Sequence, residues 1–276
     1  MRLTFLVDNN ASQILMGEWG LSIYIEEEAY KILFDLGASD LFLQNARRLG
    51  KNALEPEYII LSHGHYDHTW GLNVLINQRQ LAGLWEHKPT LIAHPQAFLA
   101  KHRQNQSEFG MTIAQATIEH NFKTQLTREP YWITKNLVFL GEIKRRVPFE
   151  NRKPLGKVSD LNGDFSDDFL LDDSALALKT SQGLVVISGC AHAGICNIIE
   201  HAREVCGDER VVDVIGGFHL KEPECDEEQL RETLGYLKKF NLKSVYPCHC
   251  TSLAAKVGLL QVGALHEVSV GLTIEY

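Results

Sequence analysis

Six consecutive residues, His63-Gly64-His65-Tyr66-Asp67-His68, hold three imidazoles and a carboxylate. Neutral imidazole and carboxylate are the side chains that hold zinc, iron or manganese in proteins. The spacing lets His63 and His65 take one metal ion while Asp67 and His68 take a second one close by. A two-metal centre polarises a substrate and generates hydroxide at neutral pH, so this segment predicts metal-dependent catalysis.

The residues on either side predict a loop on which these side chains can converge. The apolar run from Tyr58 to Leu61 predicts a buried strand directly before the cluster, and a helical pattern begins at Gly71 and continues to about Leu81. Strand, cluster and helix occur together, which favours a metal site over a polar surface loop.

Three further histidines also follow predicted strands, where the loops of α/β proteins build their sites. His192 follows the strand 184–187, His219 the strand 211–215 and His249 the strand 243–246. From the residues alone, each is either a site residue or an ordinary surface or packed histidine. Two glycines precede His219 and permit close approach of the backbone, so we expect His219 to line the site as a catalytic acid or as a donor to a phosphate or oxyanion.

Three motifs in this region, together with the first cluster, carry a family resemblance. The pattern His63-x-His65-x-Asp67-His68 after an apolar strand resembles the signature of the metallo-β-lactamase superfamily, and Phe34-Asp35-Leu36-Gly37 resembles its "fDxG" strand end. The later segments are Ser188-Gly189-Cys190-Ala191-His192-Ala193-Gly194, Gly216-Gly217-Phe218-His219-Leu220 and Tyr246-Pro247-Cys248-His249-Cys250-Thr251. Together they resemble the branch labelled 7,8-dihydropterin-6-methyl-4-(β-D-ribofuranosyl)aminobenzene-5′-phosphate synthase-like.

The resemblance implies a fold and a ligand set. The fold is an α/β, four-layer αββα sandwich with the metals at one sheet edge. The ligands are zinc-binding side chains for one or two ions, with iron or manganese as alternatives: His63, His65, Asp67, His68, His192 and His249. Asp67 is expected to serve in catalysis as well.

The chain departs from this superfamily at one ligand. Many members carry an Asp that bridges both metals, and here Cys190 stands at the superficially equivalent place with His192 two residues on. Thiolate suits zinc and imidazole suits several metals, so either can ligate, and we favour His192 because a bridging thiolate is readily oxidised. His94 is a less favoured ligand, and Asp35 is expected to orient a ligand histidine instead of binding metal.

Composition narrows the class of protein. The chain has 276 residues, of which 45% are hydrophobic and 22% charged, which is typical of a globular protein. Its net charge of −8 argues against general nucleic-acid binding, and no apolar stretch is long enough for a membrane helix. All six cysteines lie in the last third of the chain, which fits reduced thiols in the cytoplasm better than a disulfide scaffold.

We expect a single domain over residues 1–276 in which strands and helices alternate. The segment 141–173 is interpreted as a long loop with little regular structure in its later part, and as a candidate wall of the substrate site. Its acidic residues from Asp164 to Asp173 are alternatively a solvated surface. Lys144-Arg145-Arg146 either grips a substrate phosphate or forms a solvated turn.

The leading hypothesis for function is a metal-dependent hydrolase in which metal-bound hydroxide attacks a small-molecule ester, phosphoester or similar substrate. The branch resemblance implies an alternative, a transferase that joins a pterin methyl group to an aromatic amine, so the substrate is expected to be phosphorylated or pterin-like. A third reading is a non-catalytic metal-binding protein with a vestigial site. Flavodiiron chemistry is disfavoured because His65 stands where those proteins have an acidic residue.

Overall fold

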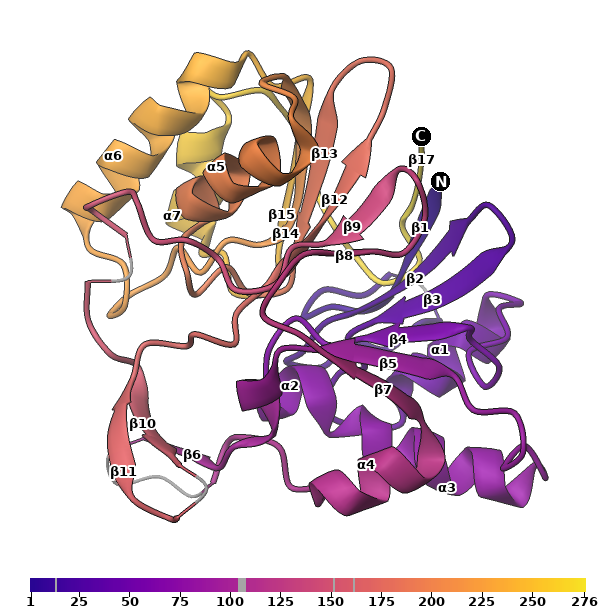
Figure 1. The fold of residues 1–276 in the computed structure, drawn as a ribbon. Coiled ribbons are helices and arrows are strands. Elements are labelled where there is room, and N and C mark those ends of the chain that lie inside the picture. Colours follow the sequence, from indigo (N-terminus) through magenta and orange to yellow (C-terminus); the bar gives the residue numbers. More distant parts are fainter. Residues whose placement is uncertain (13, 104–107, 151, 161) are drawn as a thin grey trace. The chain divides into compact units, whose positions relative to one another are not determined.

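The computed structural model describes residues 1–12, 14–103, 108–150, 152–160 and 162–276. They form two compact units (Figure 1), each described by itself. The first unit consists of Met1–Thr127, Gly156–Ser166 and Ser269–Tyr276, and the second of Arg128–Leu155 and Asp167–Val268. A single domain over the whole chain stays a prediction.

The first unit is built on a seven-stranded sheet. Its strands, in spatial order, are β17 (Thr273–Glu275), β1 (Arg2–Val7), β2 (Ser22–Glu27), β3 (Tyr30–Phe34), β4 (Tyr58–Ile60), β5 (Thr90–Ala93) and β7 (Lys123–Leu126). Its helices are α1 (Leu41–Arg48), α2 (Tyr66–Thr69), α3 (Gly71–Leu81), η1 (a 3-10 helix, Pro95–Phe98) and α4 (Gln115–Asn121). Strands β3, β4, β5 and β7 run parallel, so their carboxyl ends share one edge, and the first cluster follows β4 there.

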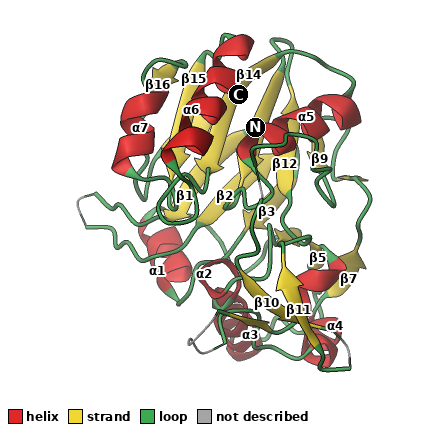
Figure 2. Cartoon of the chain, turned by 90° about the vertical axis from the view of Figure 1, so that its left-hand side faces the viewer, coloured by secondary structure: helices red, strands yellow, loops and turns green. Residues whose placement is uncertain are grey.

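A smaller, three-stranded sheet contradicts the prediction that the later part of 141–173 has little regular structure (Figure 2). It consists of β6 (Lys101–His102), β10 (Gly156–Ser159) and β11 (Phe165–Asp168). The Asp160 carboxylate accepts backbone N–H groups of Asn162 and Asp164, which closes the turn between β10 and β11. Strand β11 is largely exposed and β10 is half-buried, and both are rich in polar residues, so they lack the apolar alternation that reveals a strand in sequence. Asn151 and Leu161 of the predicted loop lie outside the described residues.

The second unit repeats the α/β pattern on another seven-stranded sheet. Its strands, in spatial order, are β16 (Ala264–Leu265), β15 (Ser244–Cys248), β14 (Val211–Gly217), β13 (Leu184–Ser188), β12 (Ala175–Lys179), β9 (Leu137–Phe139) and β8 (Tyr131–Trp132). Its helices are α5 (Ile195–Cys206), α6 (Glu227–Leu237), η2 (Lys238–Phe240) and α7 (Leu253–Leu259). The Asp226 side chain caps α6, since its carboxylate accepts the Gln229 N–H at 2.8 Å.

Apolar packing of helices on one face of the second sheet holds its strand ends in place. Val186 and Val214 of the sheet belong to one core cluster with Ile198 of α5, Leu234 of α6 and Leu259 of α7 (Figure 1). Burying each such side chain stabilises the fold by about 1.5–3 kcal/mol. The predicted α/β class, with sheets flanked by helices, is confirmed.

Helix α7 near the carboxyl end was not expected from the sequence, and the last strand, Thr273–Glu275, is short. Leu253, Val257 and Leu260 in and after α7 are exposed, so the helix lacks a clear amphipathic signal in sequence. None of the helices in the described part of the chain combines the length and the apolar character needed to cross a bilayer.

Candidate metal centre

The first cluster lies on the loop after β4 and on the short helix α2. Its four polar side chains are buried: His63 and His68 have no exposed surface, and His65 and Asp67 expose 5% and 6%. The ring centroid of His63 lies 4.5 Å from that of His65 and 4.3 Å from that of His68. The structure therefore gathers three imidazoles as the spacing predicts, with Asp67 and His68 on α2 instead of a loop.

Asp35 fixes the orientation of His68. This buried carboxylate ends β3 with a left-handed backbone (φ 58°), and its Oδ2 accepts a hydrogen bond from His68 Nδ1 at 2.7 Å. A proton held on Nδ1 leaves the Nε2 lone pair of His68 for a metal ion. The expectation that Asp35 orients a histidine of the cluster is confirmed as a contact.

Ser62 fixes the orientation of His63 in the same way. Its backbone N–H and its hydroxyl donate to the two carboxylate oxygens of Asp35, at 2.7 and 2.6 Å. The hydroxyl has a single proton, so at 2.9 Å it accepts from His63 Nδ1. The Nε2 of His63 is then the unprotonated atom, and His65 Nδ1 lies 2.9 Å from it. Two of the three imidazoles thus have tautomers that suit metal ligation.

The loop that carries His63 and His65 is tightly packed against η1. A methyl group in place of the Gly64 hydrogen would collide with the backbone carbonyl of Ala97 in η1. His94, at the end of β5, is fully buried, and its Nδ1 accepts the Gln96 N–H at 3.1 Å as the cap of η1. This hydrogen bond engages Nδ1 of His94. Metal ligation by His94 stays the less favoured prediction.

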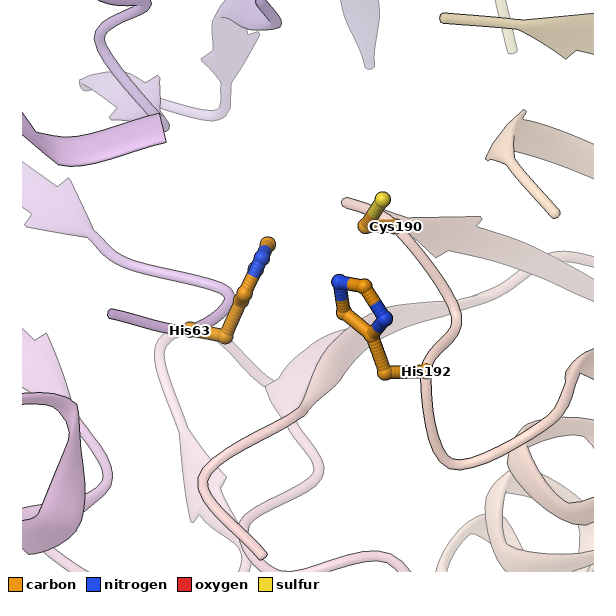
Figure 3. A group of neighbouring side chains, drawn as sticks. All are labelled: His63, Cys190 and His192. Carbon is orange, nitrogen blue, oxygen red and sulfur yellow. The ribbon is translucent and has the colours of Figure 1, made fainter. Parts of the chain in front are cut away.

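The second unit delivers its candidate side chains at one edge of its sheet. Strands β13, β14 and β15 are parallel neighbours, so their carboxyl ends lie side by side. Parallel sheets build their sites at this edge. The residues that follow these three strands are Cys190 and His192, then His219, then His249 and Cys250. Figure 3 shows Cys190 and His192 on the turn after β13, and His63 of the first unit on its own loop.

Within this group, the sulfur atoms and rings are in contact. Cys190 Sγ lies 2.9 Å from Cys250 Sγ and 3.6 Å from His219 Nδ1. The rings of His192 and His219 are 4.2 Å apart. Burial alone would raise the pKa of the Cys250 thiol, but hydrogen bonding by Cys190 and His219 outweighs it and holds this pKa well below its ordinary value.

Three residues of this edge adopt backbone conformations that side chains disfavour. Ala191, His219 and His249 have φ angles of 45°, 51° and 47°. Such left-handed residues store strain and persist where the surrounding structure holds them, which is common at functional sites. His219 Nε2 is buried and makes no hydrogen bond to the described residues, which leaves a polar atom for a ligand.

A buried carboxylate anchors the turn that carries His192. Asp173 is fully buried and accepts the Ala193 N–H at 2.8 Å. Burial raises its pKa to about 7, although the N–H groups of Ala193 and His192 and the charge of Arg145 lower it. Asp168 and Asp172 are buried as well, whereas Asp164 and Asp167 are exposed, so the solvated-surface reading holds only for the first part of the acidic run.

Glu150 anchors the helix that follows this turn. Its two carboxylate oxygens accept the N–H groups of Cys196 and Asn197 at the start of α5, at 2.9 and 2.8 Å. Burial raises the pKa of Glu150 to about 7 against these hydrogen bonds. A methyl group on Gly194 (φ 100°) would collide with the Glu150 carboxylate, so only glycine fits here.

The basic segment 144–146 is engaged in structural contacts. Lys144 and Arg146 both form ion pairs with Glu204, at 2.7 Å each. Arg145 donates to the backbone carbonyls of Phe169 and Leu170. These contacts favour the reading of this segment as part of the scaffold over the phosphate grip. That the segment 141–173 borders a substrate stays a prediction.

The sequence analysis did not identify Ser62, Glu150 or Asp173 as residues of these two groups. It also did not predict the contact of Cys250 with Cys190. The Cys-His-Cys spacing of Cys248, His249 and Cys250 was a usable signal for Cys250. The other three act through backbone or hydroxyl contacts that no sequence pattern displays.

Comparison with known proteins shows the family of the chain. Residues 20–249 match the model of the metallo-beta-lactamase superfamily. The chain is 31% identical over 250 residues to the 7,8-dihydropterin-6-methyl-4-(beta-D-ribofuranosyl)-aminobenzene-5'-phosphate synthase of Methanocaldococcus jannaschii, covering 86% of this chain and 82% of that protein. It is also 31% identical over 263 residues to the uncharacterized protein MJ0448 of the same organism, covering 94% of each.

A solved structure is similar over the whole chain. Tm1679, described as a metal-dependent hydrolase of the beta-lactamase superfamily, matches with a TM-score of 0.85 and 29% identity. The match covers 100% of this chain and 99% of that one. The same fold and a similar sequence therefore occur in one relative described as a hydrolase and in another named as a synthase.

Proposed function

The chain belongs to the metallo-β-lactamase superfamily, and from this premise we propose that it is a metal-dependent hydrolase of small molecules. One set of hydrogen bonds carries the proposal. Asp35 orients His63 through the Ser62 hydroxyl and orients His68 directly, so that both imidazoles present a ring-nitrogen lone pair inside a buried cluster. Three buried imidazoles and a carboxylate at one place in a core cost desolvation free energy, which binding of a metal ion would offset. The donor chemistry therefore fits a resident metal.

We assign the ligands as the sequence predicts them: His63, His65, Asp67, His68, His192 and His249. Imidazole and carboxylate together suit zinc, with iron or manganese as alternatives, for one or two ions. A metal bound there polarises the substrate and lowers the pKa of its water. Histidine Nε2 atoms supply neutral lone pairs, and the carboxylate of Asp67 supplies negative charge that offsets the metal.

His219 is assigned as the proton donor or oxyanion partner. Its Nε2 is buried without a partner among the described residues, and its backbone is held in a strained conformation. If Nδ1 is unprotonated toward Cys190, the ring proton resides on Nε2, where it can be donated to a leaving group. The substrate is proposed to be an ester, phosphoester or thioester, and its phosphate, if present, must be recognised by groups other than 144–146.

A second candidate is transfer of a pterin methyl group to an aromatic amine. It is supported by the 31% identity to a relative named as a pterin-related synthase. In that case, the same ligand set would activate a leaving group instead of water. None of the six cysteines, all among the described residues, forms a disulfide, which suits the reducing compartment proposed for either activity, the cytoplasm.

Metal analysis followed by substrate screening tests the proposal. Protein purified without added metal is expected to contain one to two equivalents and to cleave at least one member of a panel of chromogenic esters, phosphodiesters and thioesters. Coupling of a reduced pterin with an aromatic amine, in the absence of cleavage of any panel member, would favour the transferase. Less than one equivalent of metal, with no activity after reconstitution, would show the site to be vestigial and overturn both.

A further inference from the structure

We propose that Cys190, Cys250 and His219 form a thiolate-rich metal site that binds one soft divalent ion, such as Zn²⁺ or Fe²⁺. This site goes beyond the proposed hydrolytic function because all three donors belong to the second unit. None of the three is in the assigned ligand set of the hydrolase. Two thiolates and one imidazole would leave a fourth position open to water or a small ligand.

The spacing of the donor atoms carries the proposal. Sγ of Cys190, Nδ1 of His219 and Sγ of Cys250 all lie within 4.8 Å of one another. A tetrahedral zinc ion with ordinary bond lengths places sulfur and nitrogen ligands about 3.6 Å apart and two sulfur ligands about 3.8 Å apart. The sulfur–nitrogen separation of Cys190 and His219 is 3.6 Å, and the two sulfurs, at 2.9 Å, need to separate by about 0.9 Å.

The surrounding backbone is arranged for a thiolate at Cys250. The backbone N–H of His219 donates to Cys250 Sγ at 3.2 Å, a contact typical of metal-bound thiolates. Gly217 leaves the space for this sulfur, since a methyl group there would lie 2.7 Å from it. The strained φ of His219 is the conformation that presents both its N–H and its ring to the sulfur pair.

Three other cysteines of the second unit serve as a comparison, because they pack in its apolar core. Cys196, Cys206 and Cys225 are members of the apolar core cluster of the second unit. Cys190 and Cys250 are equally buried but lie at the strand ends, against each other and a histidine. Packing accounts for the first three thiols and does not account for this pair.

Binding would form two metal–sulfur bonds and one metal–nitrogen bond. The two thiol protons leave for the solvent, so affinity rises with pH. His219 ligates through Nδ1 and keeps its proton on Nε2, which is compatible with its proposed role as a donor.

Cobalt titration of the reduced full-length protein tests the site without a substrate. Co²⁺ bound by thiolate gives an intense sulfur-to-metal absorption in the near ultraviolet, which imidazole and carboxylate ligands do not give. The wild-type protein is expected to show this band at one equivalent. Cys190→Ser and Cys250→Ser are expected to abolish it, and His219→Ala to weaken cobalt binding by about 10–100-fold. The matched control, Cys225→Ser, is expected to keep the band.

A variant of the first unit separates this proposal from the hydrolytic one. His63→Ala is expected to lose metal from the first cluster and to keep the thiolate band. Absence of the band in the wild type, its survival in Cys190→Ser, or its loss in His63→Ala would each overturn the independent site. So would a disulfide, seen as four free thiols instead of six in protein unfolded without reductant.

The rate of alkylation keeps the test decisive if a serine variant fails to fold. Both thiols are buried, so labelling of the wild-type protein with iodoacetamide is followed over hours in urea below the unfolding transition, where the structure opens transiently. Zn²⁺ is expected to slow labelling of Cys190 and Cys250 more than that of Cys225, as read by peptide mass spectrometry. Equal slowing of all three, or none, would contradict the proposal.

Discussion

The two groups of candidate ligands are held in different ways. In the first unit, side chains orient side chains: Asp35 and Ser62 set the protons on His68 and His63. In the second unit, buried carboxylates hold the backbone: Asp173 and Glu150 bind N–H groups on either side of Gly194. The first arrangement fixes tautomers, and the second fixes the backbone of the turn and of the start of α5. Substitutions should therefore affect the two groups differently.

The largest effect is expected from the first cluster itself. His63→Ala removes an imidazole whose Nε2 is prepared for metal, so hydrolytic activity should fall by at least about 100-fold, with loss of bound metal. Activity and metal content of the purified variant measure this. His120→Ala, on the exposed surface of α4, is the control. Wild-type activity in a folded His63→Ala protein would remove the first cluster from the mechanism.

A smaller effect is expected from the residue behind the cluster. Asp35→Asn replaces one carboxylate oxygen by a donor, which breaks either the contacts of Oδ2 with His68 and the Ser62 hydroxyl or the contact of Oδ1 with the Ser62 N–H. Metal affinity should fall by about 10–100-fold while the ligands remain. Competition with a chelator gives this number, and Asp40→Asn, at an exposed helix end, serves for comparison. An unchanged metal affinity would mean that the orientation of His63 and His68 by Asp35 does not contribute to metal binding in the first unit.

The second unit should instead respond to pH. Glu150 has a folded pKa of about 7, raised above its ordinary value of 4.5, so the folded state binds its proton more tightly than the unfolded state. The stability from this proton is fully present below about pH 4.5 and is lost as pH rises toward 7. The difference in unfolding free energy between wild type and Glu150→Gln should shrink by roughly 2 kcal/mol between pH 5 and pH 8.

Urea unfolding at the two pH values measures this difference. Glu119→Gln, on the exposed side of α4, is the control and should show little change between them. A difference for Glu150→Gln that stays constant or grows with pH would show that Glu150 is ionised throughout and does not act as described.

The smallest effect is expected on the surface of the second unit. Lys144→Ala removes an exposed ion pair with Glu204, which is worth at most about 1 kcal/mol. The KM for any phosphorylated substrate should stay within about twofold, since this segment is part of the scaffold. A tenfold rise in KM without loss of stability would instead indicate that residues 144–146 bind the substrate phosphate.

The sequence predicted the gathering of the first cluster because its side chains are contiguous. Six residues carry its four candidate donors, and the strand before them and the helix after them have strong apolar patterns. Asp35 could be anticipated because it ends a strand in a recognisable motif. Ser62 could not, because its role depends on one hydroxyl proton shared between Asp35 and His63.

The second group was only partly predictable. His192, His219 and His249 stood out as histidines at strand ends, but pairing of Cys190 with Cys250 joins residues 60 positions apart. Glu150 and Asp173 lie in a polar segment that looks solvated, and burial of a carboxylate is decided by tertiary packing. The hairpin of β10 and β11 was missed because backbone pairing, not side-chain pattern, creates it.

The shared edge of β13, β14 and β15 has a consequence for how this protein tolerates change. All second-unit candidates project from that edge, while the turns that enter the strands, around Gln182, Glu209 and Asn241, lie at the opposite one. Insertions at those entry turns should leave every donor atom in register. A single residue inserted inside any of the three strands would rotate its donor to the wrong face. Changes in length should therefore be tolerated on one side of the sheet, and the candidate donors lie on the other.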